Sequence, residues 1–174
     1  MGRIAFSQIN AQPDLLDQTG FLLDLGLLPL GGSAVHLAIK CLNVPIPGMG
    51  QEGMTATLHG FTFGFRGRRT YPGTFSPTFY EDSEMRTLSA LQSWLEYTVG
   101  SESGNSQGYK KDYSVDANLI VYDTTGKAIR AHIIERCRIQ DIPDVTFDGS
   151  SSSPVQVAPT FAYDRIDWNN GRML

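Results

Sequence analysis

The chain has 174 residues, of which 41% are hydrophobic and 18% charged, and this length and apolar content suit one domain with a substantial core. Its 18 glycines and 9 prolines favour a β-rich fold with many turns. The formal net charge is −4, and no cluster of lysine and arginine is dense enough to grip a phosphate backbone, so stable nucleic-acid binding is not expected.

The first part of the chain is the least regular. Its leucines suit either a short helix or an extended segment, and we interpret residues 1–32 as an N-terminal arm and residues 33–174 as a single domain. Asp24 and Pro29 interrupt the apolar stretch 21–32 well before the roughly 20 residues that a membrane-spanning helix requires. No membrane span is therefore expected.

The next two segments predict a strand and a contact loop. Apolar residues alternate with more polar ones from Ser33 to Cys41, which predicts a half-buried strand with His36 on its wetter face. Residues 42–53 combine prolines and glycines with apolar side chains, which is typical of a loop that contacts another protein. Packing of this loop on its own chain is the alternative. The candidate contact residues are Val44, Pro45, Ile46, Pro47, Met49 and Gln51.

A long apolar segment follows. From Met54 to Gly67 the apolar positions change from even to odd, which predicts one long strand with a bulge or bend at Gly60. Arginines at positions 66, 68 and 69 then predict a solvated or partner-facing turn, with a phosphate clamp as the alternative.

A strand at residues 75–80 leads into the only helix that the pattern predicts firmly, at about residues 84–99. Asp82 or Ser83 is expected to cap its start, and Gly100 to end it. Its apolar spacing of three and four predicts a face packed against a sheet. The packing residues are expected to be Leu88, Leu91, Trp94 and Leu95.

The remaining chain reads as strands. Segments 113–122 and 128–139 predict a β-hairpin closed by a turn at Gly126, and a last strand is expected at residues 155–168. With a short strand possible at 145–147, the fold class is mainly β (α+β): an antiparallel β-sandwich or barrel of about six to eight strands flanked by one α-helix. Strand edges that such a domain leaves open favour self-association.

No catalytic constellation is visible in the sequence. His36, His59 and His132 are far apart, and Cys41 and Cys137 lack a histidine at metal spacing, so we expect free thiols, no metal and no cofactor. The chain is therefore not expected to be an enzyme. A carbohydrate- or peptide-binding β-sandwich, and more remotely a hydrolase using His59 or His132, stay open as alternatives.

Several short motifs follow each other along the chain: Cys41–Pro45, Phe75–Glu81, Leu91–Leu95 with Tyr97, Gly108–Lys111, Asp123–Ile129, Arg138–Ile142 and Phe161–Trp168. Their order and spacing resemble those of the tail tube proteins of contractile-tailed bacteriophages, which are related to the tubes of R-type bacteriocins and type VI secretion systems. The resemblance covers about residues 33–168. One departure lies before Asp141, where the family often has a tryptophan followed by proline.

The resemblance implies a structural protein of the virion tail, assembled in the host cytoplasm. It implies a homohexameric ring with a continuous inner β-barrel, and rings stacked by the loop at residues 44–51. The implied partners are the tail sheath protein, the baseplate hub, the tail terminator and a tape-measure protein, with double-stranded DNA passing through the lumen without sequence-specific binding. The tube of a contractile injection system or bacteriocin is the alternative. Which strand face would line the lumen stays open.

Overall fold

The computed structural model describes residues 16, 19–29, 34–100, 109–150 and 152–167. Within them the chain is mainly β, with eleven strands in three antiparallel sheets and three helices, so the predicted α+β class is confirmed. Many strands have only two to four residues, which is why sequence patterns predicted fewer of them. The helices are α2 (Val35–Lys40), α3 (Arg86–Val99) and α4 (Lys110–Tyr113).

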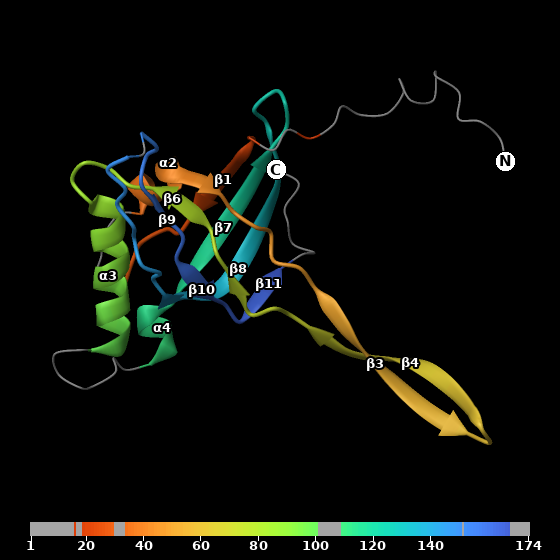
Figure 1. Ribbon diagram of the computed structural model, residues 1–174. Coiled ribbons are helices and arrows are strands. Elements are labelled where there is room, and N and C mark those ends of the chain that lie inside the picture. Colours follow the sequence, from red (N-terminus) through yellow and green to blue (C-terminus); the bar gives the residue numbers. More distant parts are fainter. Residues whose placement is uncertain (1–15, 17–18, 30–33, 101–108, 151, 168–174) are drawn as a thin grey trace.

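A six-stranded sheet forms the body of the molecule, and α3 runs along one side of it (Figure 1). Its strands in order are β1 (Phe21–Asp24), β7 (Val115–Tyr122), β8 (Ala128–Asp141), β10 (Thr160–Ala162) and β5 (Thr74–Phe75), with β11 (Arg165–Asp167) also paired to β8. A three-stranded sheet contains β2 (Cys41–Asn43), β6 (Thr78–Tyr80) and β9 (Gln156–Val157). The third sheet is the hairpin of β3 (Gly50–Leu58) and β4 (Phe61–Thr70).

The long helix α3 confirms the predicted packing helix. Leu91 and Trp94 are buried, while Leu88 and Leu95 are partly buried against the same core. The Trp94 ring lies 5.6 Å from that of Phe161 on β10, measured between centroids, and its Nε1–H donates to the Tyr113 carbonyl at 2.9 Å. This one side chain therefore joins α3 to both the sheet and α4.

Carboxylates cap the start of α3. Asp82 Oδ1 accepts a hydrogen bond from the Arg86 N–H at 3.0 Å, and the two carboxylate oxygens of Glu81 accept from the N–H groups of Thr87 and Leu88. These bonds satisfy donors that have no partner inside the helix. At the other end, Gly100 adopts the left-handed conformation with φ 62°, as predicted.

The hairpin of β7 and β8 is also confirmed, with Gly126 at φ 80° in its turn, but the assignment of its faces is corrected. Alternation along the sequence groups Ile133 with Cys137 on one face and His132 with the arginines on the other, whereas His132 is buried like Cys137 and Ile133 is only half-buried. A bulge explains the change: Arg136 has φ 56°, and its N–H donates to Asp116 Oδ1 at 2.9 Å. An inserted residue shifts every later side chain to the opposite face.

The strand predicted over residues 33–41 is wrong, because residues 35–40 form α2. Ala34 and Leu37 are buried and Cys41 is half-buried, a spacing that fits one face of a helix. Val35 and Ile39, which the strand prediction placed in the core, are 62% and 76% exposed. In so short a segment, periods of 2 and 3.6 fit the apolar residues almost equally well.

Part of the segment that we expected to form an N-terminal arm lies in the body of the molecule. Residues 21–24 form β1 at the edge of the six-stranded sheet, and Leu23, Leu25 and Leu28 belong to the core. Residues 1–15, 17–18 and 30–33 of the expected arm lie outside the described residues. The predicted last strand consists of β9, β10 and β11 in turn, and residues 145–147 form no strand.

Candidate assembly surface

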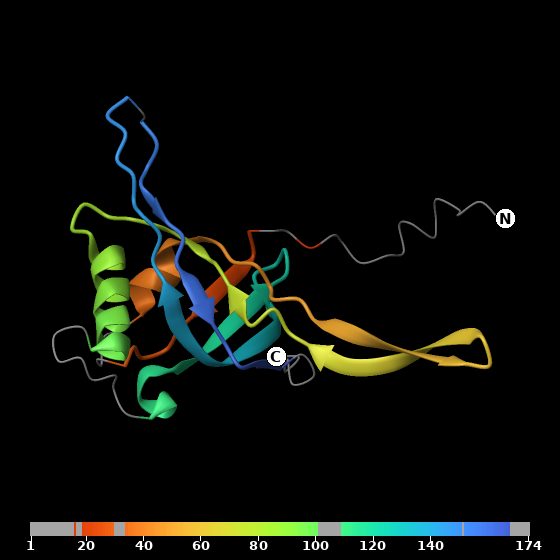
Figure 2. The same cartoon turned by 60° about the horizontal axis from the view of Figure 1, so that its bottom comes forward.

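The segment predicted as one bent strand is instead a hairpin that projects from the body (Figures 1 and 2). Gly60 lies in its turn: His59 has φ 51° and Gly60 φ 82°, as the mirror-image turns of two-residue hairpins require. The prediction of a bulge at Gly60 is therefore wrong. The change of apolar parity marks a reversal of the chain.

The pairing of β3 and β4 gathers the apolar residues of both strands on one face. Residues directly opposite each other share a face of the ribbon, and the pairs are Met54 with Phe65, Ala56 with Phe63, and Leu58 with Phe61. Thr57 pairs with Thr62 on the other face, where their hydroxyl oxygens lie 3.4 Å apart. The hairpin is thus amphipathic although it projects into solvent.

The apolar face of the hairpin is open. The exposed fractions are 58% for Met54, 56% for Leu58, 70% for Phe61, 47% for Phe63 and 47% for Phe65. A two-stranded ribbon by itself is only marginally stable in water, and a contiguous exposed apolar surface of this kind makes the hairpin a candidate protein contact. We call this set of five side chains the ribbon face.

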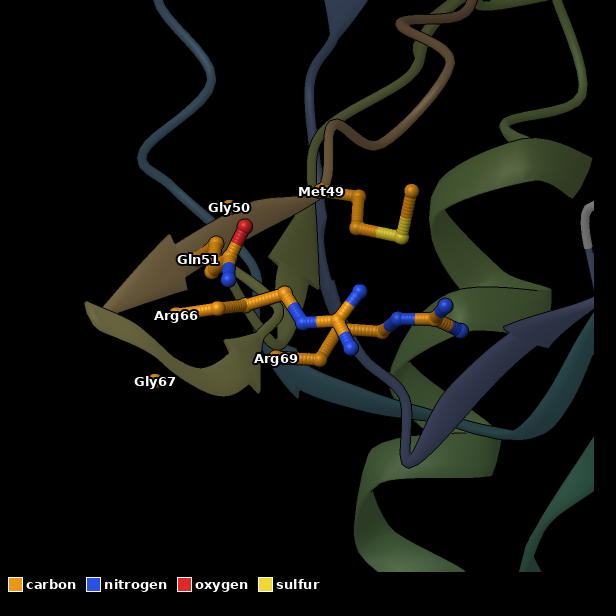
Figure 3. Close-up of a pocket in the computed structure, with 6 residues that line it drawn as sticks. All are labelled: Met49, Gly50, Gln51, Arg66, Gly67 and Arg69. Atoms are coloured by element: carbon orange, nitrogen blue, oxygen red, sulfur yellow. The ribbon is translucent and has the colours of Figure 1, made fainter. Parts of the chain in front are cut away.

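The base of the hairpin carries two arginines on the same side. Arg66 and Arg69 are three positions apart on β4, a separation that points side chains to opposite faces of a regular strand. Here Gly67 and Arg68 together face the single residue Glu52, because Gly53 pairs with Arg66 and Gln51 with Arg69. This bulge restores the parity, and Figure 3 shows the two side chains extending in the same direction.

Glycine is required at position 67 of the bulge, since a Cβ there would lie 2.1 Å from the Glu52 carbonyl oxygen. Arg68 points to the other face, where its guanidinium lies 3.6 Å from the Glu52 carboxylate. Neither Arg66 nor Arg69 forms an ion pair within the described residues. Together with Met49, Gly50 and Gln51 they line a depression of about 490 Å³ (Figure 3).

The candidate contact residues at 44–51 lie between the body and the hairpin. Val44 packs against the core and Pro47 is buried, so these two serve the chain's own packing. Ile46 and Met49 are 46% and 51% exposed, and Gln51 is an exposed residue of β3. Sequence reasoning proposed this segment as a contact but missed the adjoining ribbon face, for which His59-Gly60 between two apolar runs was the available signal.

No catalytic arrangement is visible in the described part of the chain. No group of three or more metal-ligating side chains is found there. His132 lies in the body, where burial and then the charge of Arg130 hold its pKa below the usual value. Among the residues that the structure describes, no helix is long and apolar enough to span a bilayer.

The fold is that of tube-related proteins of contractile injection systems. One similar solved structure is the sheath/tube terminator of PVC, an extracellular contractile injection system, in the extended state (11% identity, 90% of this chain and 98% of that chain, TM-score 0.67). Another is the PVC sheath-tube complex, also in the extended state (12% identity, 95% of this chain and 97% of that chain, TM-score 0.65). A third is the tube-terminating cap of the anti-feeding prophage (11% identity, 90% of this chain and 92% of that chain, TM-score 0.67). No protein-family model and no curated protein sequence matches the chain.

Proposed function

We propose that this protein is the structural subunit of the inner tube of a contractile phage tail, where it forms hexameric rings stacked into a conduit for double-stranded DNA. The observation that carries the proposal is the ribbon face, whose five large apolar side chains are about half exposed or more. Burial of such side chains contributes roughly 1.5–3 kcal/mol each. A second copy of the chain supplies that burial within a ring or between rings.

The stacking contact belongs to the segment before the hairpin and to the hairpin itself. The exposed members of the predicted stacking loop are Pro45, Ile46, Met49 and Gln51, and the loop leads directly into β3. The partner surface is apolar as well: a groove of about 480 Å³ runs between β1, β7 and residues 42–46. Contacts of one copy's projection with another copy's body are heterologous, which is how rings and stacks form.

The charge of the chain suits a passage for DNA. With a net charge of −4 per subunit, a ring repels a polyanion on the whole. Each arginine or lysine contact to a phosphate adds salt-dependent affinity, which a conduit must avoid. The tail sheath, baseplate hub, tail terminator and tape-measure protein are the partners that this function entails.

The experiment is negative-stain electron microscopy of the purified protein beside a variant with Phe61, Phe63 and Phe65 changed to serine. We expect rings or tubes from the natural chain and none from the variant, because serine side chains lack the favourable free energy that burial of the three phenylalanines contributes to the contact. The matched control changes Thr55, Thr57 and Thr62, on the opposite face, to serine and should assemble normally. A natural chain that stays monomeric at high concentration contradicts the proposal.

The tube or the tube terminator of an extracellular contractile injection system is the second candidate. The observation in its favour is that the similar structures come from such systems, and two of them from a terminator or cap. Long tubes in the micrographs favour a tube subunit, whereas single rings favour a terminator. Capsid and terminase genes beside this one would distinguish a phage tail from an injection system.

A further inference from the structure

The chain carries a second projection, the connection that follows β8. Ile142 and Val145 pack partly against the core, which leaves Asp144, Phe147 and Asp148 on the outside. Phe147 is 66% exposed although it is aromatic. Asp148 Oδ1 accepts hydrogen bonds from the Ser150 N–H at 2.9 Å and from the Ser150 hydroxyl at 2.7 Å, which shape the tip of the loop.

The charged residues of this loop are both acidic, Asp144 and Asp148. No lysine or arginine occurs between Arg138 and Arg165, and neither Asp144 nor Asp148 forms an ion pair within the described residues. The hydrogen bonds of the Ser150 hydroxyl and amide hold the pKa of Asp148 below its usual value, so this carboxylate stays ionised at neutral pH. The loop therefore presents one exposed aromatic ring between two carboxylates.

The base of the hairpin presents the complementary arrangement. Arg66 and Arg69 extend from β4 beside a depression of about 490 Å³, and the exposed side chain of Met49 lines the same depression. Figure 2 shows the hairpin and the loop, in blue, leaving the body in different directions. The loop of the same chain therefore does not cover this depression.

We propose that the loop at residues 144–148 of one copy docks into the depression at the base of the hairpin of another copy. Phe147 enters the depression, where Met49 and the faces of the guanidinium groups suit an aromatic ring. Asp144 and Asp148 pair with Arg66 and Arg69. This contact rests on the proposed self-assembly and specifies which surfaces meet.

The spacing of the charges fits two simultaneous ion pairs. The two aspartates are four positions apart along the loop, so their Cα atoms lie at most about 14 Å from each other. The two arginines face Gln51 and Gly53, which are two positions apart on β3, so the bulge brings them to about 7 Å from each other along the ribbon. Because the two surfaces differ, each copy offers one of each, and the contact propagates from subunit to subunit.

Charge exchange tests this contact. The double variant R66E/R69E and the double variant D144R/D148R each place like charges across it, and each should raise the protein concentration needed for assembly on the order of tenfold or more. The chain with all four changes should assemble nearly as the natural chain does, because the pairs form again with reversed signs. Sedimentation and electron microscopy at several salt concentrations measure both effects.

The control is K111E/K127E, which changes the charge by the same amount at two exposed lysines away from the proposed contact. Circular dichroism verifies that all variants fold. If the natural chain assembles and R66E/R69E assembles like the control, or if the four changes together restore nothing, the contact is refuted while the tube function stands. If the natural chain never assembles, the proposed function itself fails. F147A should weaken assembly without any change in charge. Assembly of F147A at the same protein concentration as the natural chain also contradicts the contact.

Discussion

Replacing Trp94 by alanine tests how α3 is held against the sheet. The side chain is 1% exposed, its ring lies 5.6 Å from that of Phe161, and its N–H bonds the Tyr113 carbonyl. Loss of a buried tryptophan costs about 3–5 kcal/mol, and the lost hydrogen bond adds about 1 kcal/mol. For a chain of this size, at about 3 °C per kcal/mol, the Tm should fall by roughly 10–20 °C.

Thermal unfolding followed by circular dichroism measures this effect at one fixed protein concentration, because assembly itself raises the Tm. Trp94→Phe keeps most of the packing and loses the hydrogen bond, so its Tm should lie between those of the natural chain and of Trp94→Ala. Val99→Ala is the matched control on the same helix, since Val99 is 56% exposed. A Trp94→Ala chain as stable as Val99→Ala would refute the packing described for α3.

Three further changes have defined outcomes. A hydrogen bond from Lys40, and then one from the Arg86 N–H, hold the pKa of Asp82 well below its usual value. The stability that this carboxylate contributes should therefore be fully present above about pH 4 and be lost as the pH falls further. In denaturant titrations at several pH values, the free energy of unfolding of Asp82→Asn should decline less with falling pH than that of the natural chain. Gly126→Ala places a Cβ at φ 80° and should lower the free energy of unfolding by about 1–2 kcal/mol in the same titrations. Gly67→Ala forces a methyl group against the facing backbone of β3, so sedimentation should show impaired assembly while the Tm of the body is kept.

Local signals made α3 and the hairpin of β7 and β8 predictable. Regular apolar spacing over Arg86–Val99, acidic residues before it and Gly100 after it all agree on a helix. Position 126 similarly requires a glycine in the turn. The helical pattern is long enough to exclude a strand period of 2 residues. The turn that closes the hairpin is marked strongly enough to exclude a continuous helix with a period of 3.6 residues.

Features that depend on pairing between strands were not predictable in this way. The ribbon face can be recognised only from the register that places Met54 opposite Phe65. The bulge at Arg136 reverses the faces of β8, and no glycine in the sequence indicates it. The common orientation of Arg66 and Arg69 likewise depends on a bulge. Sequence periodicity describes one strand at a time and does not contain the register between two strands.

Both native cysteines have a raised thiol pKa. Burial raises the pKa of Cys41 to about 12, and Cys137 is fully buried with its pKa raised further by the same cause. Since only the thiolate reacts readily, both sulfurs should react slowly with maleimide reagents at neutral pH. A single cysteine introduced at His59, on the hairpin tip, therefore becomes the one reactive handle in the natural background, and bifunctional cross-linkers attached there can map which neighbouring subunit the tip reaches.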